Sequence, residues 1–145
     1  MLSYFPAAYT DELFYSRCAR YAEWAAYPTT RTAIKELLGK PSPTIAIDFP
    51  RPFEAFVAEL PPAYQEDINH LINASTLFPF YAPFLTASRG QDLRQFMRGQ
   101  KSPVRSSGVL GWLVNKSVRS PYPRLCLACA EEDQARYGES YWHRV

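Results

Sequence analysis

The sequence predicts an all-α domain made of several short helices. Apolar residues recur at intervals of three and four in several segments, which is the spacing that lines one face of a helix. Thirteen prolines are spread along the 145 residues, and each limits the length of the element that contains it. Because 47% of the residues are hydrophobic and no segment is dominated by charge, we expect one packed core rather than a disordered chain.

The first helix is expected to open at Asp11 and to place Glu12 in its first turn, where a negative charge suits the helix dipole. Pro28 ends this helix. Its apolar stripe consists of Leu13, Phe14, Cys18, Tyr21 and Ala25. The position of Cys18 within the stripe indicates a small buried hydrophobe rather than a reactive thiol.

A second helix should begin near Thr30, with Thr29 or Thr30 as its N-cap and Gly39 as its C-terminal stop. Its buried face comprises Ala33, Ile34, Leu37 and Leu38. Two amphipathic helices with a short connection predict helix-turn-helix-like packing. That spacing is typical of DNA-binding proteins and equally of an ordinary helical core, so both interpretations stay open.

Three more helices are expected further along the chain, each with its apolar residues on one side. They run from Pro52 to the Pro61-Pro62 pair, over about residues 65–73, and over about residues 88–98. We expect residues 99–108 to form a flexible connection and residues 109–118 to form a short amphipathic segment.

An aromatic run, Thr-Leu-Phe-Pro-Phe-Tyr-Ala-Pro-Phe-Leu, occupies residues 76–85. Pro79 and Pro83 argue against a regular helix or a central strand, so this segment should wrap over the core as irregular structure. Its aromatic side chains would then act as a hydrophobic lid on the helices. If they are exposed instead, they form a patch available to a partner.

Positive charge is concentrated in the last third of the chain. Residues 1–88 hold six basic and nine acidic residues, whereas residues 89–124 hold eight basic residues and one acid, Asp92. The eight are Arg89, Arg94, Arg98, Lys101, Arg105, Lys116, Arg119 and Arg124. A segment of one sign can contact the phosphates of DNA, because each neutralised phosphate releases condensed counterions. An ordinary solvated basic face is the alternative.

Two cysteines near the end of the chain form a C-x-x-C pair. Cys126 and Cys129 have the spacing with which a tight turn presents two thiolates to one zinc ion. A structural zinc site needs four ligands, and His143, expected on a helix with Tyr141 and Trp142, is a candidate third. A redox role would require a thioredoxin-like strand-to-helix context, and no such pattern surrounds the pair.

The sequence offers little for catalysis or for membrane insertion. It contains no Walker lysine motif, no dinucleotide-binding glycine pattern and no nucleophile elbow. The three acids at 131–133 are expected in the first turn of a helix after the cysteines, where the helix dipole explains them. Without a catalytic motif, we expect no enzymatic activity. Residues 1–8 lack the features of a signal peptide and no apolar run is long enough to span a bilayer, so we expect a cytoplasmic protein.

Three groups of residues resemble the TniQ family of TnsD-like transposon target-site selectors. The first group is Phe5, Pro6, Tyr9, Thr10, Asp11, Glu12, Leu13, Ser16 and Arg20. The second is Thr76, Leu77, Phe78, Pro79, Tyr81, Ala82, Pro83 and Phe84. The third is Cys126, Cys129, Asp133, Tyr137, Gly138, Glu139, Tyr141, Trp142 and Arg144. They occur in the same order as in the family and span nearly the whole chain.

This resemblance implies a non-catalytic adaptor in DNA transposition. Such adaptors recognise a target by binding DNA or by joining an RNA-guided complex, and they recruit an AAA+ ATPase regulator. The resemblance implies that residues 89–124 face DNA and that the N-terminal helices and the aromatic run are candidates for contact with the ATPase. It also implies a bacterial, nucleoid-associated protein. The alternative is a protein-interaction module with no DNA binding of its own.

The third group departs from the family pattern in two ways. Leu127 stands where the family usually has proline, and the family pattern normally continues to a second C-x-x-H pair that completes the zinc site. This sequence stops at Val145, before such a pair. We therefore expect a helical module at 1–125 and the first half of a zinc finger at 126–145, with Cys126 and Cys129 as the zinc ligands of a truncated site.

Overall fold

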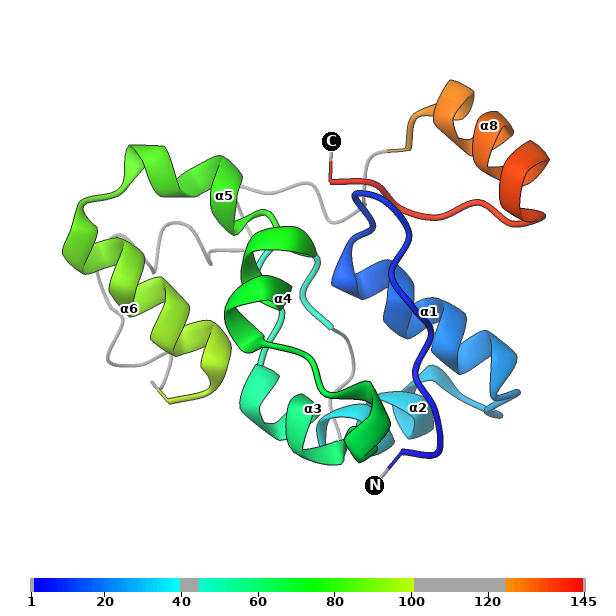
Figure 1. The fold of residues 1–145 in the computed structure, drawn as a ribbon, viewed down its shortest axis with the longest axis horizontal. Coiled ribbons are helices and arrows are strands. Elements are labelled where there is room, and N and C mark those ends of the chain that lie inside the picture. The colour runs from blue at the N-terminus through cyan, green and yellow to red at the C-terminus, as the bar shows by residue number, and fades with distance from the viewer. Residues whose placement is uncertain (1, 40–44, 101–124, 145) are drawn as a thin grey trace.

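The chain folds into a set of short packed helices (Figure 1). The computed structural model describes residues 2–39, 45–100 and 125–144. The α-helices in these ranges are α1 (Phe14–Trp24), α2 (Thr30–Leu38), α3 (Phe53–Glu59), α4 (Ile68–Ala74), α5 (Phe78–Tyr81), α6 (Ala87–Arg98) and α8 (Leu127–Tyr137). Two 3₁₀ helices, η1 (Pro62–Tyr64) and η2 (Ala82–Phe84), lie between them.

The all-α prediction is confirmed for the described ranges, where the only extended pairing is an isolated antiparallel bridge between Glu12 and His143. Three predicted helices correspond to α3, α4 and α6, although α4 begins at Ile68, three residues after its predicted start. Most of the predicted connection 99–108 and all of the predicted segment 109–118 lie outside the described residues. Among the helices described, none is long and apolar enough to cross a lipid bilayer.

Helix α2 is bounded by the residues that the sequence predicts. The Thr29 hydroxyl accepts a hydrogen bond from the backbone N–H of Thr32, at 3.2 Å, and so caps the first turn. Gly39 ends the helix with a φ of 64°, a conformation that favours glycine. The apolar faces of α1 and α2 pack in the same core. Because this packing fits an ordinary helical core as well as a DNA-binding unit, helix-turn-helix packing for DNA binding stays a prediction.

Helix α1 begins three residues later than the sequence predicts. Asp11 has a φ of 56°, in the left-handed region, so the chain turns sharply before the helix. Leu13 is the N-cap and gives no side-chain hydrogen bond. The Glu12 carboxylate instead accepts a hydrogen bond from the backbone N–H of Tyr9, at 2.9 Å, and turns into the protein. The prediction that Glu12 serves the helix dipole is therefore wrong.

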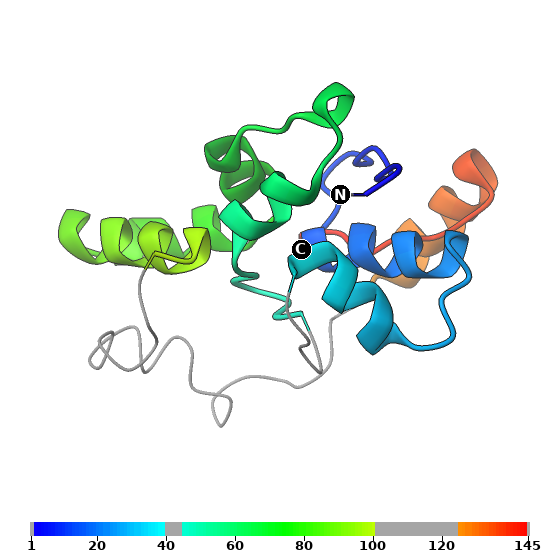
Figure 2. The same ribbon diagram turned by 90° about the horizontal axis from the view of Figure 1, so that it is seen from below.

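Phenylalanine rings fill the centre of the core between α1 and α3. Phe56 packs edge-on against Phe5 and Phe14, with ring centroids 4.8 and 4.9 Å apart, and Phe53 meets Phe14 at 4.9 Å. Edge-to-face contacts of this kind add to the free energy gained by burying the rings. The N-terminal segment before α1 is thus part of the core. Figure 2 shows α1 and α8 on one side of the molecule and α6 on the opposite side.

A buried network of charged side chains joins α1 to both ends of the chain. The guanidinium of Arg20 donates two hydrogen bonds to Glu12, at 2.9 and 2.7 Å, and a third to Glu139, at 3.3 Å. Glu12 is 1% exposed and Arg20 is 5% exposed. The Ser16 hydroxyl donates to the same Glu12 carboxylate at 2.9 Å. The carboxylate therefore has donors that offset the cost of burying its charge.

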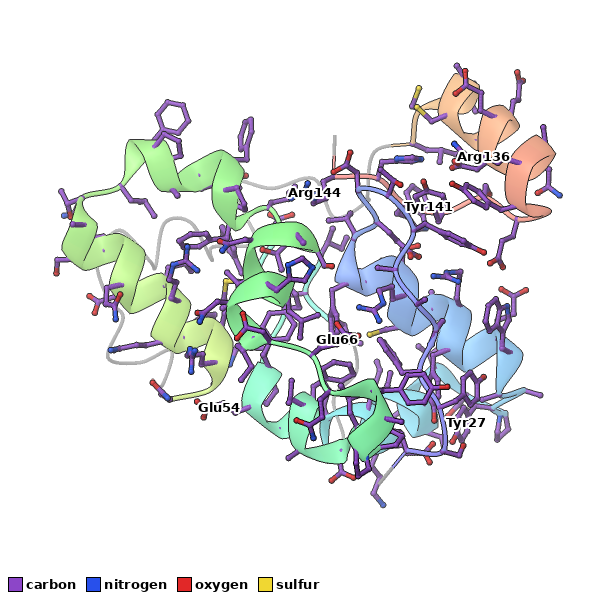
Figure 3. All side chains as sticks on the ribbon, viewed as in Figure 1. Tyr27, Glu54, Glu66, Arg136, Tyr141 and Arg144 are labelled. Atoms are coloured by element: carbon purple, nitrogen blue, oxygen red, sulfur yellow. The ribbon has the colours of Figure 1, made fainter. Side chains whose placement is uncertain are left out.

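A second buried arginine attaches the N-terminal segment to the region before α4. Arg17 donates to the backbone carbonyl of Pro6 and forms a two-pronged ion pair with Glu66, at 3.0 and 2.6 Å (Figure 3). Its guanidinium also lies over the Phe5 ring, 4.6 Å from the centroid. Through Arg17 and Arg20, α1 therefore contacts the N-terminal segment, the region before α4 and the segment after α8.

Replacing Arg20 by methionine is expected to lower the free energy of unfolding by about 3–5 kcal/mol, because the Glu12 carboxylate then stays buried without its counter-charge. Urea denaturation followed by circular dichroism measures this change. The control is Arg31→Met on the exposed surface of α2, which should alter the free energy by no more than about 0.5 kcal/mol. Equal effects of the two substitutions would contradict a structural role for the Arg20 network.

Candidate functional site

The C-x-x-C pair lies at the start of α8. Cys126 is the N-cap residue and is exposed, and Cys129 lies half-buried in the first turn. The helix therefore begins between the two cysteines rather than after them. As a consequence the acids at 131–133 follow the first turn, which contains no acidic residue, and the prediction that they lie in the first turn is wrong.

The two thiols differ in acidity. A hydrogen bond from the backbone N–H of Cys129 lowers the pKa of Cys126, with further help from the Cys129 thiol and the backbone of Ala128. The hydrogen bond that Cys129 donates to Cys126 raises the pKa of Cys129, and partial desolvation adds to the effect. Cys126 is thus the thiol that more readily becomes the thiolate, the form that binds metals and attacks electrophiles.

Stacked tyrosines hold α8 against the N-terminal segment. The Tyr9 ring stacks on Tyr137 with centroids 4.4 Å apart and packs against Tyr141 at 4.9 Å. The Tyr9 hydroxyl donates to Glu139 at 2.7 Å, and the Tyr141 hydroxyl donates to the Thr10 carbonyl at 3.0 Å. Burial raises the pKa of Tyr141 to about 12, so this donor keeps its proton at neutral pH.

The residues after α8 run alongside the turn that precedes α1. The Leu13 backbone N–H donates to the Trp142 carbonyl at 2.8 Å, and the Arg144 N–H donates to the Asp11 carbonyl at 2.9 Å. The Arg144 guanidinium also pairs with the Asp11 carboxylate and donates to the Asn73 carbonyl at the end of α4 (Figure 3). Segments from the start, middle and end of the chain meet here, so the segment after α8 is held against both the turn before α1 and the end of α4.

His143 is not positioned to complete a zinc site with the two thiols. It lies in the extended segment after α8, not on a helix with Tyr141 and Trp142 as the sequence suggests. Its Nε2 atom is 2.9 Å from an Asp133 carboxylate oxygen, and its ring stacks on Tyr141. In the part of the chain that the structure describes, no three His, Cys, Asp or Glu side chains are grouped to hold a metal ion.

The third cysteine is chemically separate from this pair. Cys18 is buried on α1, where it lines an apolar cavity of about 90 Å³ between α1 and α2 with Tyr15, Ile34 and Ile45 among its walls. Burial raises the pKa of the Cys18 thiol well above its ordinary value. The prediction of a buried, unreactive Cys18 agrees with this environment.

Two of the predicted DNA-binding arginines attach α6 to its neighbours. Arg94 donates to the Asn73 amide oxygen at 2.9 Å, and Arg98 donates to the Asn69 amide oxygen at 3.3 Å and lies 3.6 Å from Glu54. The two arginines are one helical turn apart on α6, and the two asparagines are one turn apart on α4. The two hydrogen bonds therefore connect the same faces of α6 and α4 at successive turns. These contacts give the two arginines a structural role that charge patterning alone did not predict.

Arg89 is the exposed member of the basic set on α6. It follows the N-cap of the helix, where the Thr86 hydroxyl accepts a hydrogen bond from the Arg89 backbone N–H. The remaining predicted DNA-binding residues lie outside the described residues: Lys101, Arg105, Lys116, Arg119 and Arg124.

The aromatic run forms two short helices, α5 and η2, rather than irregular structure. Both prolines lie in the first turn of their helix, where the missing N–H costs no intrahelical hydrogen bond. Phe78 is buried in the core, whereas Phe80 is 66% exposed and Phe84 is 81% exposed. The segment is therefore partly the hydrophobic lid and partly the exposed patch that the sequence allows. One aromatic residue covers the core, and two others form an exposed surface.

The described residues define a class of protein: an α-helical module that holds a C-x-x-C helix against its own N-terminal segment. A family model described as TniQ matches residues 3–145, so the chain belongs to the TniQ family. The transposon Tn7 transposition protein TnsD of Escherichia coli is 26% identical to the chain over 140 residues. That alignment covers 97% of this chain and 27% of TnsD, so the chain spans about a quarter of the length of this relative.

The acidity difference between the thiols predicts selective alkylation. In the folded chain at pH 7.5, iodoacetamide should modify Cys126 faster than Cys129, because the lowered pKa of Cys126 gives it the larger thiolate fraction. Peptide mass spectrometry over time measures both rates, and buried Cys18 is the internal control that reacts only after denaturation. Faster modification of Cys129 would contradict the hydrogen-bond pattern at the start of α8.

Proposed function

We propose that this chain is a non-catalytic target-selection module of a DNA transposition system. The observation that carries the proposal is the TniQ match over nearly the whole chain, together with the similarity of 97% of the chain to a protein named for Tn7 transposition. A firmly fixed module with an exposed aromatic surface suits an adaptor, whose task is to hold other molecules in a defined relation. The proposal concerns this module, not the whole of the longer relative.

DNA contact by the basic segment is the first part of the proposal. Support comes from the ratio of eight basic residues to one acid in residues 89–124. Arg89 is the described residue best placed for phosphate contact, because it is exposed, whereas Arg94 and Arg98 hold α6 against α4. We assign the remaining phosphate contacts to Lys101, Arg105, Lys116, Arg119 and Arg124.

Recruitment of an AAA+ ATPase regulator is the second part. Two regions are candidates for this contact, the N-terminal helices and the aromatic run. The arginines of α1 are engaged inside the protein, which favours the aromatic run with its exposed rings as the contact for the ATPase.

An RNA-guided complex is the alternative to DNA as the targeting partner. The module would then act through protein contacts alone.

Cys126 and Cys129 are proposed as two ligands of a structural zinc site. Their thiols lie at the N-terminus of α8, which stabilises thiolates, and the lowered pKa of Cys126 favours metal binding at neutral pH. Zinc bound there would fix the start of α8 and take no part in a chemical step. In this proposal the chain consists of a helical module at residues 1–125 and the first half of a zinc finger at residues 126–145.

Insertion-site mapping tests the proposed function. In cells that carry the transposase and the AAA+ regulator of the same transposon, removal of this protein should abolish insertion at the preferred site. Re-expression should restore it, and the Arg31→Glu variant, altered on the exposed surface of α2, should restore it equally. An unchanged distribution of insertion sites in the absence of the protein would refute a role in target selection.

A salt titration separates DNA contact from a purely protein-based role. The Arg89→Glu/Arg105→Glu variant should bind duplex DNA more weakly, and the slope of log K against log salt should fall by about 0.9 for each phosphate that the variant no longer neutralises. Fluorescence anisotropy with a labelled duplex measures both quantities. The matched control is Arg31→Glu/Lys35→Glu on α2, which should leave the slope unchanged. Lack of any DNA binding by the unaltered chain at low salt would favour the protein-interaction alternative.

A further inference from the structure

The two thiols at the start of α8 are placed to react with one another. Cys126 is the N-cap residue, with extended backbone at φ −89° and ψ 114°, and Cys129 is the third residue of the helix. A side chain at the N-cap lies over the first turn, within reach of the residue three positions further on. The Cys126 carbonyl accepts the backbone N–H of Ala130 at 3.0 Å, so this turn is closed around the pair. The Cys129 thiol lies against the Cys126 sulfur, and this contact makes the two thiols differ in acidity.

The backbone spacing of the pair also suits a disulfide. The dimensions of an α-helical turn put Cα atoms three positions apart at about 5 Å from one another. Disulfides form between Cα atoms that are about 4.4–6.8 Å apart. Both cysteines are free in this structure. Closing a disulfide between them therefore requires rotation of the two side chains and no rearrangement of α8.

An oxidant in solution reaches one thiol of the pair directly. Helix α8 lies at the edge of the molecule (Figure 1), where Cys126 is exposed and Cys129 is half-buried. The third cysteine of the chain, Cys18, is buried on α1 and is separate from the pair. An accessible thiol beside a second thiol is the arrangement in which a first oxidation is resolved as a disulfide before it proceeds further. A thioredoxin-like context is needed to exchange disulfides with other proteins, but oxidation of the pair itself needs only contact and access.

The contacts that hold α8 lie at its other end. The ring of Tyr137 stacks on Tyr9, Glu139 accepts the Tyr9 hydroxyl, and the Tyr141 hydroxyl donates to the Thr10 carbonyl. These contacts come from the last turn of the helix and from the segment after it. The first turn can therefore change its sulfur chemistry while α8 stays in place.

We propose that Cys126 and Cys129 form a reversible disulfide when the chain meets a hydroperoxide, and that this modification withdraws both sulfurs from the zinc ion. The oxidation rests on the geometry of the pair alone. Its effect on zinc rests on the zinc site of the proposed function. Zinc binds thiolates and not disulfide sulfurs, so the metal-bound pair and the disulfide are alternative states.

The reaction proceeds in two steps. In the first, the Cys126 sulfur attacks the O–O bond of the hydroperoxide. An S–O bond forms, the O–O bond breaks, and the leaving oxygen takes the thiol proton, so Cys126 becomes a sulfenic acid and the hydroperoxide is reduced to an alcohol or water. In the second, the Cys129 sulfur attacks the sulfenic sulfur, the S–S bond forms, and the S–O bond breaks as hydroxide leaves with the Cys129 proton as water. Two electrons pass from the pair to the peroxide, and a dithiol reductant returns them.

The test is mass spectrometry of the zinc-free chain after treatment with a small excess of hydrogen peroxide. The chain should lose two hydrogen atoms, and a peptide should link Cys126 to Cys129 while buried Cys18 stays reduced. Dithiothreitol should restore the dithiol. Far-UV circular dichroism should be the same before and after oxidation, because the contacts that hold α8 lie at its other end.

Two single variants test the order of the steps. Cys129→Ser should stop at the sulfenic acid, which dimedone traps on Cys126, because the thiol that resolves it is missing. Cys126→Ser should react with peroxide at least about tenfold more slowly, because the thiol that remains in the pair is half-buried.

Three results would overturn the oxidation site: a pair that stays reduced, a disulfide that links two chains instead, or a Cys126→Ser variant that reacts as fast as the unaltered chain. Zinc uptake, measured with a colorimetric chelator, separates this inference from the proposed function. The reduced chain should take up zinc, and the oxidised chain should not. If the disulfide forms but zinc uptake is the same in both states, the two cysteines are not the zinc ligands. The oxidation site then stands, whereas its effect on zinc fails together with the zinc site proposed above.

Discussion

The buried ion pair between Arg20 and Glu12 determines how the two ends of the chain meet. Asp11, in the left-handed conformation, turns the chain before α1, and Glu12 lies outside the helix with its carboxylate 2.7 Å from the guanidinium. The same guanidinium contacts Glu139, beyond α8. Desolvation alone would lower the pKa of Arg20, but the hydrogen bond and the charge of Glu12 raise it, so the arginine stays charged inside the protein. Arg20 thus adds a charged contact to the stacked tyrosines and backbone hydrogen bonds that hold α8 against the N-terminal segment.

This arrangement places two candidate surfaces at opposite ends of the module. The C-x-x-C pair lies at the start of α8, whereas the exposed rings of Phe80 and Phe84 lie on α5 and η2, on the other side of α4 (Figure 1). Arg144 spans part of the interval, because it contacts both Asp11 and the Asn73 carbonyl at the end of α4. A partner at one end and a metal at the other would therefore be connected through packed helices and hydrogen-bonded backbone. An adaptor needs such a rigid connection between the molecules that it joins.

Local signals made part of this structure predictable from sequence. The cap residues of α2 and the apolar spacing of α6 act within a few residues of one another, and both helices match expectation. The exceptions involve partners that are distant in the sequence. Glu12 departs from its predicted role because of Arg20 and Glu139, and His143 because of Asp133. Likewise, nothing in the charge pattern indicates that Arg94 meets Asn73. Contacts of this kind depend on tertiary packing, which a single sequence does not display.

The pairing of residues near the start of the chain with residues near its end also affects synthesis on the ribosome. Four groups near the start of the chain have their partners between residues 137 and 144: the backbone of Asp11 and of Leu13, the ring of Tyr9 and the guanidinium of Arg20. A growing chain can pack α1, α2 and α3 early, but it cannot close this junction until those last partners emerge from the exit tunnel. Until then the Tyr9 ring lacks its stacking partners, so the contacts that close this end of the module are the last to form during synthesis.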